Sequence, residues 1–400
     1  MRSGPLPRKE ADLCTACTTC TVVCPVSRVT SRFPGPKQAG PGVERHCGVI
    51  RGSKDDWMDL CLGCRMCEAA CPAGVNIYEL NLLERSTRKD GLTKRLRDWL
   101  LSHTYLFGPA GSRLSRLVNP LFRNPLFKWT LDVLMGIDRT STLPPYELQT
   151  FLQWFSARRF RSDRKVGYFF GCYTNTNETE VGKAVVEVLE KAGIETVLPP
   201  QKCCGIPMLG AGDMEGARRA GLWNVPALLN AVHSGLEILF SSSSCGLMIR
   251  HEYSCLFAIP GAEELAAHTL DLFQYLQGLM LSGGLSLKMK GLSMKAAYFP
   301  PCHLKSLGIG LPALDILRTI PEIEIHMLET NCCGLGGAYG FKKEKARISG
   351  DIGEDLAEEI AGVKPEIIIS DCEGCRLQIR RITGLEAVHP AQVLARVLEG

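Results

Sequence analysis

Short apolar runs alternate with longer helical patterns from about residue 165 to the end of the chain. Val166–Phe170 and Lys295–Phe299 are apolar or aromatic in the way that buried strands are. Apolar residues recur with helical spacing in Glu178–Lys191, Ala217–Val232, Arg347–Ile360 and Arg376–Ile382. This alternation predicts α/β layers around a parallel sheet, in which ligands gather at the carboxyl ends of the strands.

The same order of elements occurs twice in this region. Three cysteine landmarks recur at offsets of 130, 129 and 130 residues: Cys172 and Cys302, Cys203-Cys204-Gly205 and Cys332-Cys333-Gly334, and Cys245 and Cys375. A constant offset indicates an internal repeat. We therefore predict two α/β cysteine-rich repeats, 165–290 and 291–400, each with its strand-end loops converging on one site.

Cysteine is unusually frequent, with 19 residues in the chain. No apolar secretory segment follows Met1, so the thiols are expected to bind metal rather than to form disulfides. No uncharged stretch reaches the roughly 18 apolar residues that a membrane span needs. The sequence thus predicts a chain that is soluble or attached only to a membrane surface.

The two repeats differ in their number of thiols. The second contributes Cys302, Cys332, Cys333, Cys372 and Cys375, and the first contributes Cys172, Cys203, Cys204 and Cys245. Ser242 stands where the second repeat has Cys372. Adjacent cysteines suit an iron–sulfur assembly larger than one metal better than a single tetrahedral zinc ion. Cys255 has no counterpart and is expected in the apolar core.

The first 85 residues contain the spacing C-x2-C-x2-C-x3-C-P twice. The cysteines are Cys14, Cys17, Cys20 and Cys24 in the first copy, and Cys61, Cys64, Cys67 and Cys71 in the second. In two-cluster ferredoxins the fourth cysteine of each motif binds the other cluster. This spacing predicts one [4Fe–4S] cluster on Cys14, Cys17, Cys20 and Cys71, and a second on Cys61, Cys64, Cys67 and Cys24.

Two zinc sites are the alternative for this segment, since C-x2-C pairs also bind zinc. Zinc would not explain the third cysteine of each motif or the proline that follows the fourth. Cys47 lies outside both motifs and is expected to be a free thiol, because eight ligands complete two clusters. Residues 1–85 are therefore predicted to form a helical, ferredoxin-like domain.

Residues 86–164 differ in charge and in aromatic content. Together with Lys165 they carry 15 Lys and Arg against six acids, a surplus of nine where the whole chain has only four, and they hold 11 of its 28 aromatics. Short amphipathic helices broken by Pro109, Pro120 and Pro125 are expected. Such a segment can lie on an anionic membrane surface, or it can be a linker packed on its neighbours. Nucleic-acid binding is not favoured, since no recognised module is present.

The repeated cysteine-cysteine-glycine sequences behind a two-cluster motif resemble a known family. It includes heterodisulfide reductase cysteine-rich subunits, the iron–sulfur subunits of glycolate and lactate oxidases, and C subunits of anaerobic glycerol-3-phosphate dehydrogenases. Shorter stretches are most similar to the last group: Phe33–Pro41, Leu101–Thr104, Tyr339–Glu344, Ile352–Leu356 and Asp371–Cys375.

The resemblance implies an electron-transfer subunit with no substrate-oxidising site of its own. It would accept electrons from flavin-bearing dehydrogenase subunits and pass them toward menaquinone, at the cytoplasmic face of the inner membrane. It also implies an additional, noncubane iron–sulfur cluster in the second repeat, whereas the cluster type of the first repeat stays open. Two other functions stay open too: disulfide reduction at the five-cysteine site, and structural metal binding.

Overall fold

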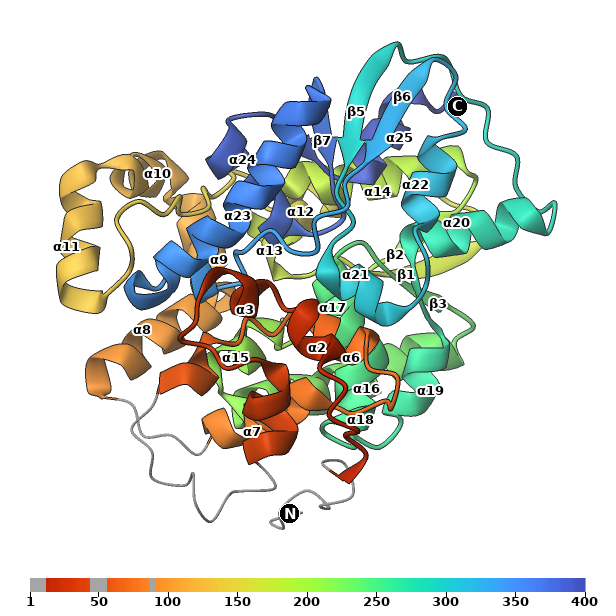
Figure 1. Ribbon diagram of the computed structural model, residues 1–400. Coiled ribbons are helices and arrows are strands. Elements are labelled where there is room, and N and C mark those ends of the chain that lie inside the picture. The colour runs from red at the N-terminus through yellow and green to blue at the C-terminus, as the bar shows by residue number, and fades with distance from the viewer. Residues whose placement is uncertain (1–11, 44–55, 87–90, 400) are drawn as a thin grey trace.

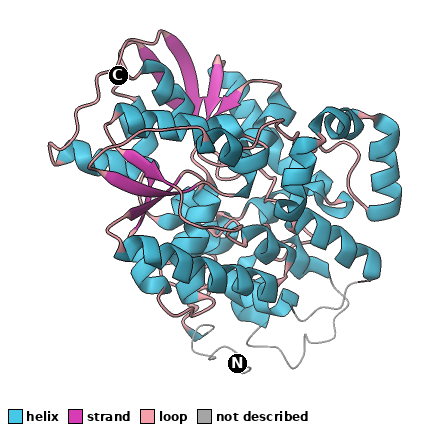
Figure 2. Cartoon of the chain, turned by 180° about the vertical axis from the view of Figure 1, so that it is seen from behind, coloured by secondary structure: helices cyan, strands magenta, loops and turns pink. Residues whose placement is uncertain are grey.

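The computed structural model describes residues 12–43, 56–86 and 91–399. Two small parallel sheets form the framework, and helices surround both of them (Figures 1 and 2). The N-terminal segment, drawn in red and orange in Figure 1, lies across the loops that leave the two sheets. The chain is thus mostly helical, with strands confined to the two repeats.

Each repeat contains four parallel strands in the same spatial order. The first sheet has the order β2-β1-β3-β4, with β1 (Lys165–Phe169), β2 (Glu195–Val197), β3 (Glu237–Phe240) and β4 (Thr269–Asp271). The second has the order β6-β5-β7-β8, with β5 (Met294–Tyr298), β6 (Ile323–Met327), β7 (Ile367–Ile369) and β8 (Ala387–Val388). The chain changes direction of winding between the two central strands, and ligands bind at such switch points.

Helices connect these strands in both repeats. The first repeat contains α13 (Cys172–Thr176), α14 (Thr179–Lys191), α15 (Ile206–Ala211), α16 (Met214–His233), α17 (Ser243–Leu247), η3 (Met248–Glu252), α18 (Tyr253–Cys255), α19 (Ala262–Ala267) and α20 (Leu272–Leu281). The second contains α21 (Cys302–Leu307), α22 (Pro312–Leu317), η4 (Tyr339–Phe341), α23 (Lys343–Val363), α24 (Glu373–Thr383) and α25 (Pro390–Val397). All four helices predicted from apolar spacing are present, as α14, α16, α23 and α24.

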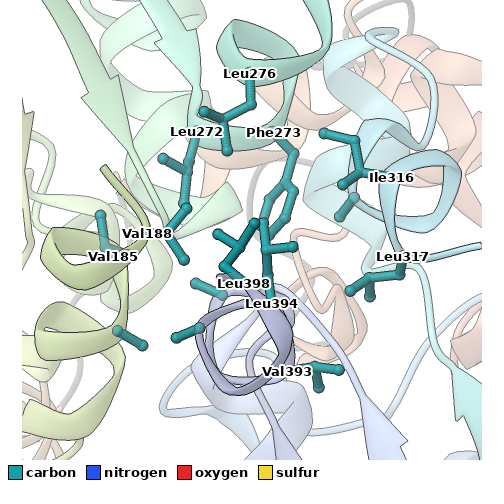
Figure 3. Close-up of a cluster of buried hydrophobic side chains, with 14 of the residues drawn as sticks. Val185, Val188, Leu272, Phe273, Leu276, Ile316, Leu317, Val393, Leu394 and Leu398 are labelled. Carbon is teal, nitrogen blue, oxygen red and sulfur yellow. The ribbon is translucent and has the colours of Figure 1, made fainter. Parts of the chain in front are cut away.

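The two repeats share one apolar core. Helices α14 and α20 of the first repeat face α22 and α25 of the second. Figure 3 shows Val188, Phe273, Leu317 and Leu394, one from each helix, meeting in this cluster. All of them are almost fully buried, and burying such a side chain is worth about 1.5–3 kcal/mol. The repeats are therefore packed against one another rather than strung along the chain.

The N-terminal segment is helical but made of short pieces. Its elements are α2 (Thr19–Val22), α3 (Pro25–Val29), η1 (Gln38–Gly42), η2 (Asp56–Leu60), α6 (Met66–Ala69) and α7 (Ile77–Ser86). Val26 and Phe33 pack against Ile348 and Ile352 of α23, while Tyr78 and Leu82 pack into the core of the first repeat. This segment thus contacts both repeats at once.

Five helices follow: α8 (Leu92–Ser102), α9 (Thr104–Arg113), α10 (Ser115–Arg123), α11 (Pro125–Met135) and α12 (Phe151–Ser156). The expectation that Pro109 and Pro120 break helices is wrong, because they lie inside α9 and α10. Both prolines are exposed, so water can solvate the carbonyls that lose a hydrogen bond. Pro125 does begin a helix, at the first position of α11, where no N–H is needed.

A charged segment at the start of α23 ties these helices to the second repeat. Glu344 accepts two hydrogen bonds from Arg97, at 2.8 and 2.9 Å, and Lys342 Nζ lies 2.8 Å from Asp98. Lys345, only 1% exposed, pairs with Asp59 of the N-terminal segment at 2.8 Å. Consecutive residues of α23 therefore reach two different parts of the chain.

The predicted fold class is confirmed: a helical N-terminal ferredoxin-like domain precedes two α/β repeats, each with its own parallel sheet. Among the described helices, none combines the length and the apolar character that crossing a bilayer requires.

A glycine follows each cysteine pair, and in the second repeat it lets the loop after the pair pack closely against α23. Gly334 has φ +86°, and a Cβ there would lie 2.3 Å from the backbone oxygen of Ser349 in α23. We expect Gly334→Ala to lower the free energy of unfolding by at least ~2 kcal/mol, from the left-handed backbone and the steric overlap together. Chemical unfolding followed by circular dichroism measures this.

Gly350 is the matched control, because it lies inside α23 and, apart from its chain neighbours and the helix's own backbone, no atom is within 4 Å of the place that a Cβ would take. Gly350→Ala should raise the free energy of unfolding by roughly 0.5–1 kcal/mol, because alanine is the better helix former. Equal effects of the two substitutions would contradict the role assigned to Gly334.

Candidate functional site

The two N-terminal motifs share a backbone conformation that brings their thiols together. Ala16 and Thr18 in the first motif, and Gly63 and Arg65 in the second, all have positive φ, between 57° and 75°. These residues flank the second cysteine of each motif, so the chain turns sharply on both sides of it. The repeated left-handed turns explain why three cysteines spaced by two residues can face one point.

The first ferredoxin-type site contains Cys14, Cys17, Cys20 and Cys71. Burial raises the pKa of the Cys20 thiol, and its neighbours Cys14, Cys71 and Cys17 raise it further. The backbone N–H of Val75 donates to Cys71 Sγ at 3.4 Å. Cys17 is exposed, so this site lies at the protein surface.

The second ferredoxin-type site contains Cys24, Cys61, Cys64 and Cys67. Burial raises the pKa of Cys61 to about 11, against the opposing effects of Arg85 and a backbone hydrogen bond from Gly63. The four thiols line one cavity together with apolar residues such as Phe33 and Ile77. The structure therefore brings together the two sets of four that the spacing predicts, with Cys24 and Cys71 exchanged between motifs.

The five-thiol site of the second repeat gathers at strand ends. Cys302 begins α21 after β5, Cys332 and Cys333 follow β6, and Cys372 and Cys375 lie at the start of α24 after β7. Hydrogen bonds from the Cys332 and Cys375 thiols lower the pKa of Cys333 to about 6, despite burial. The N–H of Gly334 donates to Cys332 Sγ at 3.4 Å. All five predicted residues are thus in one group.

The four-thiol site of the first repeat has the corresponding arrangement. Cys172 Sγ lies 3.7 Å from Cys203 Sγ, and hydrogen bonds with Cys172 and Cys204 lower the pKa of Cys203. Cys204 in turn contacts Cys245. Gly171 has φ +76°, and a Cβ there would lie 3.1 Å from Cys245 Sγ, so the backbone approaches this thiol closely.

Ser242 occupies the position of a fifth ligand in the first repeat. It is the N-cap of α17, as Cys372 is the N-cap of α24. Its hydroxyl donates to Glu373 of the second repeat, at 2.9 and 3.1 Å. The missing thiol is thus replaced by a hydrogen bond between the repeats.

Two residues near this four-thiol site were not predicted. His103, buried between α8 and α9, lowers the pKa of Cys203 further, and Tyr105 lies close enough to Cys203 and Cys172 that they raise its own pKa after burial does. In the sequence, Leu101–Thr104 stands out only as a stretch of resemblance. No spacing links it to the cysteines, so only the fold reveals the proximity.

Two other expectations on cysteines have different outcomes. The expectation that Cys255 is a core thiol is wrong: it lies exposed in α18, at the end of the helical run that follows Cys245. Cys47 lies outside the described residues. In the described parts of the chain, the thiols of each group stand apart rather than converging on the position of a single metal ion.

The donor sets fit iron–sulfur clusters. Each N-terminal group offers four thiols, one group encloses a cavity, and backbone N–H groups point at the sulfurs in both. Hydrogen bonds of this kind tune cluster potentials. The repeat groups offer four and five thiols. The N–H of Gly334 donates to Cys332 Sγ in the second repeat, and the backbone of Gly171 approaches Cys245 Sγ in the first.

The buried polar residues around these sites hold the N-terminal segment in place. His303 Nδ1 lies 3.0 Å from Ser244 Oγ, and its Nε2 lies 3.2 Å from the carbonyl oxygen of Gly63. Burial lowers the pKa of His303, so the imidazole is neutral at pH 7. Arg65, 4% exposed, pairs with the fully buried Glu252 at 2.5 Å.

Comparison with known protein families agrees with this architecture. A 4Fe-4S dicluster domain matches residues 10–75, and a cysteine-rich domain matches twice, at residues 166–250 and 296–380. Both matched families correspond to the segments that carry the thiol groups.

Individual proteins match over different lengths. Lactate utilization protein A 2 of Bacillus cereus is 29% identical over 248 residues, which is 58% of this chain and 99% of that protein. The B subunit of the fumarate reductase (CoM/CoB) of Methanothermobacter marburgensis is 29% identical over 58% of this chain and 44% of its own length. The C subunit of the anaerobic glycerol-3-phosphate dehydrogenase of Escherichia coli is 35% identical over 391 residues, 96% of this chain and 98% of that protein. The chain therefore belongs to the family of anaerobic glycerol-3-phosphate dehydrogenase C subunits.

Proposed function

We propose that this chain carries electrons from a flavin-bearing glycerol-3-phosphate dehydrogenase toward menaquinone, without oxidising the substrate itself. The observation that carries the proposal is that the thiol groups adjoin one another. Cys64 is close enough to Cys302 and Cys332 of the second repeat for their charges to interact. Ser244, next to Cys245, lies 4.0 Å from Cys372 Sγ. When bound, iron–sulfur clusters supply one-electron sites whose potentials depend on hydrogen bonding and solvent exposure.

The exposure of the thiols differs between the four groups, from the first ferredoxin-type site to the repeat sites. Cys17 is exposed and Cys14 is half-buried, so a partner protein can approach the first ferredoxin-type site. Most of the repeat thiols are less exposed: six are buried (Cys203, Cys204, Cys245, Cys332, Cys333 and Cys375) and three are half-buried (Cys172, Cys302 and Cys372). We place the contact with the dehydrogenase subunits at the exposed end.

The helices α8–α11 supply a surface for a membrane. We name their exposed apolar side chains the helical patch: Leu92, Leu96, Trp99, Leu106, Phe107, Leu117, Leu121, Leu126, Trp129, Val133 and Leu134. Figure 1 shows α10 and α11 projecting from the side of the molecule. Arg113, Arg116 and Arg123 are exposed on the same helices. An apolar surface flanked by basic residues favours peripheral attachment to anionic lipid at the cytoplasmic face of the inner membrane over a purely packed linker.

Disulfide reduction at the five-thiol site is the second candidate function. An open pocket of about 440 Å³ lies beside this site, lined by Pro300, Lys305, Leu311, Met327 and Glu329 among others. That volume is within the range of small-molecule sites. Turnover of a disulfide by the isolated, reduced chain would favour this function over a pure carrier role.

The first test of the proposed function is the iron content of the repeats. We expect anaerobically purified protein to hold iron and sulfide well above the roughly eight iron atoms of two cubanes. Cys333→Ala should lose part of that iron and one electron paramagnetic resonance (EPR) signal, because it removes a thiol at the centre of the five-thiol group.

Cys255→Ala, which removes an exposed thiol outside all four groups, is the control and should keep the wild-type iron. Two ferredoxin-type clusters alone, unchanged by Cys333→Ala, would mean that the repeats bind no cluster. Colourless protein with bound zinc would point to structural metal sites instead.

Exchange of the fourth cysteine between the motifs gives a second test. Cys24→Ala should abolish the cluster at Cys61, Cys64 and Cys67 and leave the other intact, whereas Cys71→Ala should do the reverse. EPR of the two reduced variants distinguishes the signals. Loss of the cluster belonging to the same motif in each variant would rule out the exchange.

Membrane attachment is tested by sedimentation with anionic vesicles at low salt. Replacing Arg113, Arg116, Arg123 and Lys128 by glutamine should weaken binding by about 1 kcal/mol for each charge near the lipid surface. The control replaces four exposed arginines of the repeats, Arg218, Arg219, Arg318 and Arg347, with the same loss of charge. Equal weakening in both variants would show that net charge, and not the helical patch, governs binding.

A further inference from the structure

One turn of the second ferredoxin-type motif is held from outside by the second repeat. Tyr339 Oη donates to the carbonyl oxygen of Leu60 at 3.0 Å. A Cβ at Gly336 would lie 2.3 Å from the side chain of Leu62, so the loop after the cysteine pair presses directly on the turn. His303 Nε2 lies 3.2 Å from the carbonyl oxygen of Gly63. Three successive points of the turn are thus in contact with one repeat.

The hydrogen bonds of His303 determine which ring nitrogen carries the proton. A carbonyl oxygen only accepts, so Nε2 must bear the hydrogen and donate it to Gly63. Nδ1 is then the acceptor, and Ser244 Oγ donates to it at 3.0 Å. Ser244 belongs to the first repeat and adjoins Cys245, while His303 itself follows Cys302. One neutral imidazole therefore joins the ferredoxin-like domain to both repeats.

Gly63 is the residue through which this contact reaches a sulfur. Its φ of +75° places it in the left-handed region, and hydrogen bonding from its backbone N–H opposes the rise that burial causes in the pKa of the Cys61 thiol. A Cβ at this position would lie 3.1 Å from the ring of Tyr78, so this side chain also confines the turn. Glycine is free to change both φ and ψ. Release of the Gly63 carbonyl would therefore let Gly63 leave its left-handed conformation, which would turn its N–H away from Cys61.

We propose that His303 is a positioning residue for the second ferredoxin-type site: by binding the Gly63 carbonyl, it keeps the Gly63 N–H directed at the Cys61 sulfur. This inference rests on the proposed iron–sulfur function. Hydrogen bonds to cluster sulfurs favour the more negative, reduced state. Loss of His303 should therefore shift the reduction potential at Cys24, Cys61, Cys64 and Cys67 to a more negative value and leave the first site unchanged.

Three substitutions separate this role from ordinary packing. His303→Gln places an amide N–H near the position of Nε2 and should keep a reduction potential close to that of wild type. His303→Asn places its amide near Nδ1 instead, and His303→Ala removes both groups, so both should show the negative shift. The measurement is a redox titration followed by EPR, with the two signals assigned from the Cys24→Ala and Cys71→Ala variants.

His389→Gln is the matched control, because His389 is also buried and its Nε2 lies 2.8 Å from the carbonyl oxygen of Ser241, far along the chain from Gly63. It should leave both ferredoxin-type potentials unchanged. Ser244→Ala provides a second variant should His303→Ala lose its cluster. It removes the donor to Nδ1 and should give a smaller shift in the same direction.

The role of His303 and the proposed iron–sulfur function are tested by different outcomes. A shift confined to the second site, present in Ala and Asn and reversed in Gln, supports the role of His303. So does loss of iron from that site alone in the alanine variant, restored by glutamine. Unchanged potentials in all three variants, or equal loss of every cluster in all three, would overturn it. Wild-type protein without iron would instead overturn the proposed function.

Discussion

Thiolates that share a buried site repel one another, and the rest of this structure depends on how that repulsion is managed. Burial raises the pKa of Cys64 and Cys67, and the neighbouring thiols raise it again. Several such groups cannot all ionise in a medium of low polarity unless a cation lies between them. Iron provides that charge, and binding it requires the thiols to lose their protons, so cluster binding and folding are coupled. The left-handed turns at Ala16, Thr18, Gly63 and Arg65 then serve to hold ligands where they would not gather by themselves.

The ligands must also be held in place between domains, and buried charged residues serve this purpose. Apolar contacts alone would let the N-terminal segment slide on the repeats, whereas ion pairs with defined geometry fix its orientation. Arg65 binds Glu252 of the first repeat, and Lys345 of the second repeat binds Asp59. Buried ion pairs add little net stability but are lost at high cost if misaligned. We interpret these two as registry contacts that keep Cys64 beside Cys302.

Much of the architecture follows from the sequence because cysteine spacing and the repeat are local or periodic signals. The 129- to 130-residue offsets correspond to two sheets with identical strand order, and the apolar spacing located four long helices. Features that depend on distant neighbours could not be predicted. Cys255 is predicted to lie in the core, but it is exposed at the end of a helix that begins with the buried Tyr253. His103 approaches Cys203 only because α8 and α9 fold over the first repeat. The ligation of each group, and the boundaries at 85, 164 and 290, stay predictions.

Duplication made the two repeats alike, and their differences lie where they touch. Ser242 and Cys372 cap equivalent helices, but only one is a thiol, and the serine hydroxyl instead binds Glu373 beside the cysteine. Ser244 likewise binds His303, beside Cys302. Each of these two serines of the first repeat thus makes a polar contact to a residue that adjoins a predicted ligand in the second repeat. A symmetrical pair of five-thiol sites would have placed another ionisable thiol at this shared boundary. Replacing it by a neutral hydroxyl reduces the repulsion there and leaves the four-thiol site next to the helices of the helical patch, with His103 between them.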